Sequence, residues 1–143
     1  MKVDLGCGVN KPEGYVGIDL LETADIKWDL RNGIPLEDNS VDGVRAKDFL
    51  EHMPNTIAIM NECWRVLQPE GLLETVVPRF PHVDSVKDPT HVRFFTVETF
   101  TEYFGGPDRL EAEYGMHLWD ILQLVHEEHR IWVTLRPRGK HAG

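Results

Sequence analysis

The chain opens with Val3-Asp4-Leu5-Gly6-Cys7-Gly8, and Gly17-Ile18-Asp19 follows shortly afterwards. Each stretch is a short apolar run with a carboxylate at or near its end, and the first continues into two glycines. In an α/β sheet, ligands bind at the carboxyl ends of parallel strands, where glycines let the backbone turn sharply and approach a ligand. A carboxylate after the next strand can accept two hydrogen bonds from a ribose diol. This opening therefore predicts an α/β sheet with a nucleoside pocket.

The glycine spacing narrows the class of nucleoside. A dinucleotide-binding fold has a G-x-G-x-x-G turn and an acidic residue about 20 positions further on. Here Lys11 stands where the third glycine would be, and Asp19 comes too early. The sequence also has no G-x-x-x-x-G-K-[ST] phosphate loop. These features favour a ligand without phosphates.

At these residues the chain resembles the class I S-adenosylmethionine-dependent methyltransferases. In that family a D-x-G-x-G loop lies beside the methionine part of the cofactor, and the acid after the second strand holds the ribose. Two further blocks match: Leu50-Glu51-His52, which borders the methyl-transfer site in many small-molecule methyltransferases, and residues 65–73, which fit an R-V-L-x-P-x-G-x-L pattern. Glycine is more usual where Glu70 stands. The resemblance covers the first half of the chain and implies S-adenosylmethionine as the cofactor.

The resemblance also implies which residues contact the cofactor. Asp29 follows the third strand and is the expected acceptor for the adenine amino group, with an ordinary loop acid as the alternative. The implied cofactor residues are Asp4, Gly6, Cys7, Gly8, Asp19, Leu20, Asp29 and Leu30.

The acceptor side is expected after the fourth and fifth strands. Methyl transfer requires the acceptor to be aligned with the methyl group, and a hydroxyl acceptor also needs a base, for which histidine is suited near neutral pH. His91 is the first candidate for the catalytic base and His82 the second, with Asp48 or Asp84 orienting the imidazole. His52 and Arg93 are expected to contact the substrate. The alternative for these histidines is a loop-ordering role.

A metal site in the same region is the weaker alternative. His82, Asp84, Asp88 and His91 offer nitrogen and oxygen donors for a divalent ion. Their spacing matches no standard metal motif, so we expect no metal.

The hydrophobic pattern predicts mostly strands. The resemblance implies a Rossmann-like, mostly parallel, seven-stranded sheet whose last strand is antiparallel. One helix is predicted over residues 55–67, from a stripe of Ile57, Met60, Trp64 and Leu67, and another from Thr96 to Phe104. Residues 79–90 are predicted to be a loop and residues 137–143 a frayed tail. Strands are predicted at residues 3–5, 15–20, 26–30, 41–46, 72–77, 110–118 and 128–136.

The first two connections are too short for parallel crossovers, which usually need about a dozen residues and a helix. Only residues 9–14 and 22–25 are available. Crossover helices are therefore expected to be missing, and part of one sheet face should be bare. Because large bare apolar patches usually mark interfaces, we expect a homo-oligomer.

Composition excludes several classes. A chain of 143 residues fits a single domain over residues 1–143. The net charge of −9 argues against nucleic acid as the main partner. No apolar run approaches the roughly 20 residues of a membrane span. With two cysteines and no expected signal peptide, a cytoplasmic location is predicted.

The sequence thus predicts a small cytoplasmic methyltransferase that acts on a hydroxyl or amine of a small molecule, sugar or nucleotide metabolite. A methyltransferase-like binding protein without activity is the first alternative, because methyl transfer benefits from a closed, dry site and the missing helices leave the site open. A modifier of a macromolecule is the second.

Overall fold

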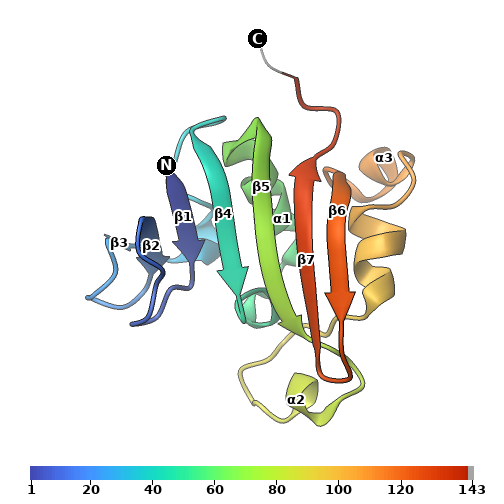
Figure 1. Cartoon of the computed structure of the whole chain (residues 1–143), viewed down its shortest axis with the longest axis horizontal. Helices are drawn as coiled ribbons and strands as arrows, with labels where there is room; N and C mark the ends of the chain where they lie inside the picture. The colour runs from blue at the N-terminus through green and yellow to red at the C-terminus, as the bar shows by residue number, and fades with distance from the viewer. Residues whose placement is uncertain (142–143) are drawn as a thin grey trace.

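Helices pack against one side of a single seven-stranded sheet in the computed structural model, which describes residues 1–141 (Figure 1). The strand order is β3-β2-β1-β4-β5-β7-β6. Only β7 runs against the others, because it pairs antiparallel with both β5 and β6. The expected Rossmann-like sheet is confirmed. The strands are β1 (Lys2–Leu5), β2 (Tyr15–Asp19), β3 (Ile26–Lys27), β4 (Val41–Lys47), β5 (Leu67–Pro78), β6 (Trp119–His126) and β7 (Arg130–Pro137).

The core lies between the sheet and two helices, α1 (Thr56–Val66) and the π-helix η3 (Thr99–Phe104). Asn55 begins α1 by accepting a hydrogen bond from the Ala58 N–H, as expected for a helix N-cap. The predicted helix is confirmed, but its buried stripe is rotated to Ile59, Met60, Cys63 and Val66. Trp64 lies at the edge, stacked 3.9 Å from the His117 ring.

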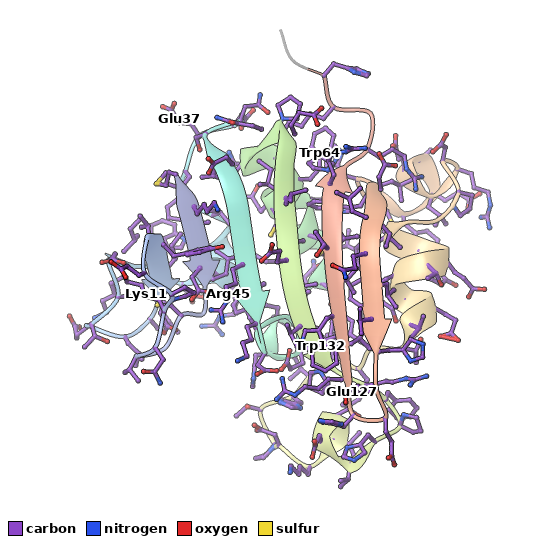
Figure 2. All side chains as sticks on the ribbon, viewed as in Figure 1. Lys11, Glu37, Arg45, Trp64, Glu127 and Trp132 are labelled. Atoms are coloured by element: carbon purple, nitrogen blue, oxygen red, sulfur yellow. The ribbon has the colours of Figure 1, made fainter. Side chains whose placement is uncertain are left out.

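The opposite face of the sheet carries no helix among residues 1–141 (Figures 1 and 2). The first two connections are turns, as their length predicted. Adjacent strands align a row of polar residues across this face. The row runs from Asp4 through Arg45, Glu74 and Thr134 to Gln123. The face is therefore bare, but charged and polar side chains cover it where an apolar patch was expected.

The predicted strand over residues 110–118 is wrong. Residues Leu110–Tyr114 form helix α3, which ends where Gly115 adopts a left-handed conformation with φ of 64° and donates its N–H to the Glu111 carbonyl. β6 begins only at Trp119, so a tight turn joins it to β7. A glycine C-cap explains the end of the helix.

Three other boundaries differ. The third strand ends at Lys27 because Asp29 accepts the Arg31 N–H and begins the short helix η1 (Leu30–Asn32). The fifth strand starts at Leu67, directly after α1. The loop after it contains α2 (Val83–Val86), and the turn η2 (Leu50–His52) follows β4.

The C-terminal tail is packed rather than frayed up to residue 141, and residues 142–143 lie outside the described part. Lys140 Nζ donates to the carbonyls of Trp64 at 2.6 Å, Arg65 at 2.9 Å and Leu67 at 2.5 Å. The ammonium group thus lies at the C-terminal end of α1, where a cation is stabilising. Within residues 1–141, no helix is long and apolar enough to cross a membrane.

Candidate functional site

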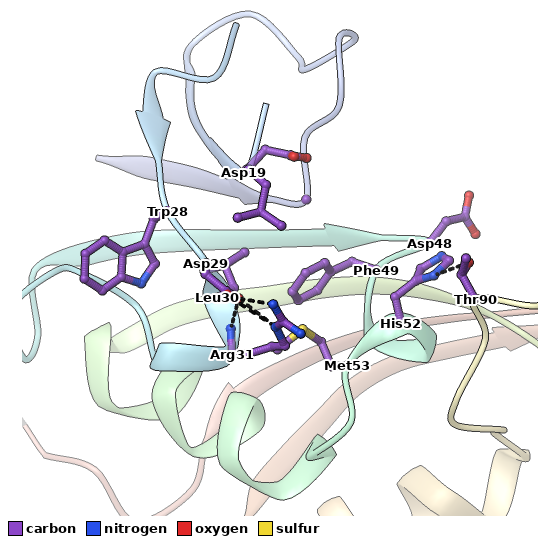
Figure 3. A pocket seen from close by; sticks show the side chains of 12 residues that line it. Asp19, Trp28, Asp29, Leu30, Arg31, Asp48, Phe49, His52, Met53 and Thr90 are labelled. Atoms are coloured by element: carbon purple, nitrogen blue, oxygen red, sulfur yellow. Dashed lines mark hydrogen bonds and ion pairs between the residues drawn. The ribbon is translucent and has the colours of Figure 1, made fainter. Parts of the chain in front are cut away.

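A cavity of about 650 Å³ lies at the carboxyl ends of β1, β2 and β4 (Figure 3). Trp28 lies at one end of it, and Asp48, His52 and Thr90 lie at the other. Asp19 lies between these two groups. The volume is in the range of about 300–1,000 Å³ that small-ligand sites occupy, and the strand ends are where such sheets bind ligands.

The glycine turn after β1 forms the floor of the cavity. Gly6 has a φ of +64° and Gly8 a φ of +57°, which L side chains rarely adopt. The Gly6 N–H donates to the Ile18 carbonyl at 2.9 Å. A Cβ at Gly6 would lie 2.5 Å from Cδ1 of Phe49, whose ring covers this glycine. The turn therefore has no space for a side chain at position 6.

Asp19 links the second strand to that turn. Its Oδ2 accepts the Gly8 N–H at 3.0 Å, and its Oδ1 accepts the Leu21 N–H at 3.1 Å. A carboxylate has about four acceptor positions, so each oxygen can accept one more hydrogen bond from a ligand in the cavity. This half-buried carboxylate suits a pair of adjacent hydroxyls.

At the end of the cavity formed by Trp28, Asp29 is paired with Arg31, two residues further along the chain. The Asp29 carboxylate lies 3.0 Å from Arg31 Nε and 2.7 Å from Arg31 Nη2. Hydrogen bonds from the Arg31 side chain and backbone lower the pKa of Asp29. Trp28 donates its indole N–H to the Gly33 carbonyl and offers its ring to the cavity. This end combines an aromatic surface with a fixed acidic group.

Asp48 follows β4 at the opposite end. It has a φ of 51°, an uncommon value for a residue other than glycine, and backbone strain of this kind often accompanies functional sites. Its Oδ1 pairs with Arg130 Nη1 at 2.7 Å. The Asp48 N–H donates to the Val76 carbonyl, which fixes the end of the strand.

Glu51, His52 and His91, together called the Glu51 cluster, lie beside Asp48. Glu51 is only 2 % exposed, and its Oε1 has no hydrogen-bond partner among the described residues. Burial raises the pKa of Glu51 to about 7. His52 Nε2 lies 4.0 Å from Glu51 Oε2, and the His52 and His91 rings meet edge to face at 4.8 Å.

The structure brings most of the predicted site residues together. The cavity is lined by Gly6, Asp19, Leu20, Asp29, Leu30, Asp48 and His52. Gly8 lies behind Asp19 and donates to it, and His91 lies behind His52.

Four predicted residues point elsewhere. Asp4 is 2 % exposed on the bare side of the sheet and pairs with Arg45 at 3.0 Å. Cys7 also faces that side, where its Sγ covers Gly17. His82 does not line the cavity, and its Nδ1 accepts the Asp84 N–H as the N-cap of α2. Arg93 borders a separate, shallower pocket.

Sequence reasoning gave Glu51 no role. The available sequence signal is that Glu51 lies between two apolar residues, Leu50 and Met53, which are both buried. A glutamate in such a stretch is a candidate for a functional role, because glutamate is rarely buried without a partner. Met53 and Thr90 also line the cavity without having been predicted.

Known proteins resemble this chain in sequence family and in fold. Residues 3–75 match the model of the methyltransferase domain family. An S-adenosylmethionine-dependent methyltransferase from Archaeoglobus fulgidus is 16% identical, with a TM-score of 0.67 over 94% of this chain and 85% of that one. One from Aquifex aeolicus is 16% identical, with a TM-score of 0.63 over 94% and 80% of the two chains.

The [4+2]-cyclase SpnF is also similar, with 17% identity and a TM-score of 0.70 over 99% of this chain and 74% of that one. At these identities the three structural likenesses show the fold. No curated protein matches the chain.

Proposed function

Because this chain belongs to the methyltransferase domain family, whose cofactor is S-adenosylmethionine, we propose that it methylates a hydroxyl or amine of a small molecule, sugar or nucleotide metabolite. The observation that carries this proposal is the cavity at the strand ends, where Asp19 is oriented by two backbone N–H groups beside the glycine turn.

The residues of the cavity fit the cofactor. Asp19 has acceptor positions for the two ribose hydroxyls, and the bare backbone at Gly6 lets a ligand approach closely. Trp28 and the backbone beside Leu30 are placed to contact the adenine. When bound, S-adenosylmethionine would supply a methyl group on a positively charged sulfur: the bond from the acceptor to the methyl carbon forms as the carbon–sulfur bond breaks, and S-adenosylhomocysteine leaves.

The acceptor is proposed to bind at the end of the cavity formed by Asp48, His52 and Thr90. The Glu51 cluster lies there and provides the groups that can assist loss of the acceptor's proton. His91 is better placed than His82, because His91 adjoins His52 whereas His82 caps α2. Asp48, fixed by Arg130, can orient the acceptor or an imidazole.

Cellular context and assembly belong to the same proposal. A cytoplasmic location is supported by two buried cysteines that form no disulfide. A second copy of the chain is proposed to cover part of the bare sheet face, where Leu72, Val76 and Trp132 lie half-buried among charges. Light scattering after size exclusion should then give a mass above that of one chain, and a monomer peak would contradict the oligomer.

Calorimetric titration with S-adenosylmethionine and with S-adenosylhomocysteine tests the cofactor site. We expect both ligands to bind with micromolar affinity at one molecule per chain, because both carry the nucleoside that the site is proposed to bind. If neither ligand binds to protein whose circular dichroism shows a folded sheet, the proposed function is wrong.

The likeness to the [4+2]-cyclase SpnF favours one second candidate, a protein of this fold that does not transfer a methyl group. A panel of hydroxyl and amine acceptors, with S-adenosylhomocysteine formation as the readout, separates the two. Turnover with any acceptor supports the methyltransferase. Tight cofactor binding without turnover across the whole panel supports the second candidate.

A further inference from the structure

We infer that Glu51, His52 and His91 bind a divalent transition-metal cation at the acceptor end of the cavity. One carboxylate oxygen and two imidazole nitrogens lie there within 4.8 Å of one another. Ligand atoms about 2.1 Å from a tetrahedral metal ion lie about 3.4 Å apart. The three side chains therefore need to close by up to about 1.4 Å to share one ion.

The Nε2 atom of each imidazole makes no hydrogen bond among the described residues and can bind a metal, although that of His91 lies 3.6 Å from Asp88 Oδ2. His91 Nδ1 lies 3.0 Å from the Ser85 carbonyl, which can only accept, so this nitrogen carries the proton. His52 Nδ1 lies 3.0 Å from Thr90 Oγ1. The Thr90 hydroxyl donates to Asp88 at 2.7 Å and therefore accepts from His52. Metal-binding histidines are oriented by such partners.

Glu51 supplies the observation that points to a cation. It is 2 % exposed, and its Oε1 has no partner among the described residues. Arg130, whose charge acts on Glu51, forms its ion pair with Asp48. A buried carboxylate oxygen without a hydrogen bond is costly. A metal ion between the imidazoles and this oxygen would remove the cost.

The donor set selects the kind of cation. Two imidazoles and one carboxylate suit zinc, manganese, iron or cobalt, whereas magnesium and calcium prefer oxygen ligands alone. Three protein ligands also leave coordination positions open, which is the pattern of catalytic rather than structural metal sites. His52 lines the cavity, so the open positions would face the acceptor.

The role of the ion rests on the proposed function. An acceptor hydroxyl bound to a divalent cation loses its proton more readily, and that proton would pass to water at the open mouth of the cavity. In this arrangement His91 acts as a ligand, so the cation assumes the activating role that a free imidazole base would otherwise have.

Cobalt titration of chelator-treated protein without a histidine tag tests the site directly. We expect one Co²⁺ per chain with visible absorption bands, and competition by Zn²⁺. Glu51→Gln and His52→Gln should each weaken Co²⁺ binding by at least about 100-fold, since even outer-shell changes cost up to that much. His126→Gln is the matched control, because His126 is an exposed histidine at the end of β6.

Two checks keep the outcomes separate. Glu51 is buried, so its variant must retain the parent's circular dichroism; His52 is exposed, and its variant provides the same test without a change in the core. Absence of Co²⁺ binding, or equal binding by both variants and the parent, would overturn the inference. S-adenosylhomocysteine binding is measured separately with chelator present, so loss of the metal site and loss of the cofactor site are distinguishable.

Discussion

Asp19→Ala is expected to weaken binding of S-adenosylhomocysteine by at least about 100-fold. The alanine removes the acceptors for the ribose and the two hydrogen bonds from Gly8 and Leu21 that hold the turn. Hydrogen bonds to a charged group contribute about 1.5–3 kcal/mol each, and about 1.4 kcal/mol corresponds to tenfold in affinity. Calorimetric titration measures the loss.

Asp25→Ala is the matched control for this prediction. Asp25 also accepts a backbone N–H, from Gly17 at 2.8 Å, and pairs with Lys11, but it does not line the cavity. The same chemical change there should leave the affinity within a few-fold of the parent. Equal affinities for Asp19→Ala and the parent would show that the ribose is not held by this carboxylate.

Gly6→Ala should lower the free energy of unfolding by about 2–5 kcal/mol. A left-handed conformation costs an L-residue about 1–2 kcal/mol. The added methyl group would also meet the Phe49 ring, and overpacking typically costs about 1–3 kcal/mol. Because Phe49 lines the cavity, its displacement should also weaken cofactor binding. Urea unfolding and calorimetry measure the two effects.

Gly8→Ala separates these two causes. Gly8 has nearly the same φ, but a Cβ there would meet nothing within 4 Å. We therefore expect only the conformational cost of about 1–2 kcal/mol. The double variant Gly6→Ala/Phe49→Ala should recover part of the cofactor affinity. If Gly6→Ala and Gly8→Ala behave alike, the contact with Phe49 has no consequence.

Elements with a complete local signal could be predicted from the sequence. The helix after Asn55 combines a cap, an apolar stripe and a proline-containing stop, and it forms as predicted at α1. The turns in place of crossover helices followed from chain length alone, because the six residues from Val9 to Gly14 are too few for a crossover helix. Both features depend on neighbours in the sequence.

Features that depend on distant residues could not be predicted. Helix α3 is an exception with a local cause, because residues 110–114 have no strong period and the signal for a helix was the cap at the adjacent Gly115. Lys140 looked like part of a loose basic tail, and only the fold brings it to the end of α1. The direction of Asp4 depends on Arg45, its neighbour on β4 41 positions away.

The residues of the candidate site also fall into those that could be predicted from the sequence and those that could not. Gly6 and Asp19 could be placed because the ends of parallel strands meet at one edge of a sheet. Glu51 could not, because its burial depends on packing from the loop that contains His91. That loop adds Val92 and Arg93, whose N–H groups both donate to the Glu51 carbonyl.

Without crossover helices, β1, β2 and β3 form a unit that pairs with the rest of the sheet along a single strand, β4. Residues 1–29 join the larger part of the sheet through the short β1–β4 ladder, through the ion pairs of Asp4 with Arg45 and of the Met1 amino group with Asp42, and through the common core. Such a unit can open by itself at a lower free energy than global unfolding. The cavity has Asp19 on this unit and His52 on the other part. A nucleoside bound between them would fasten the unit in place, as a pair of crossover helices would.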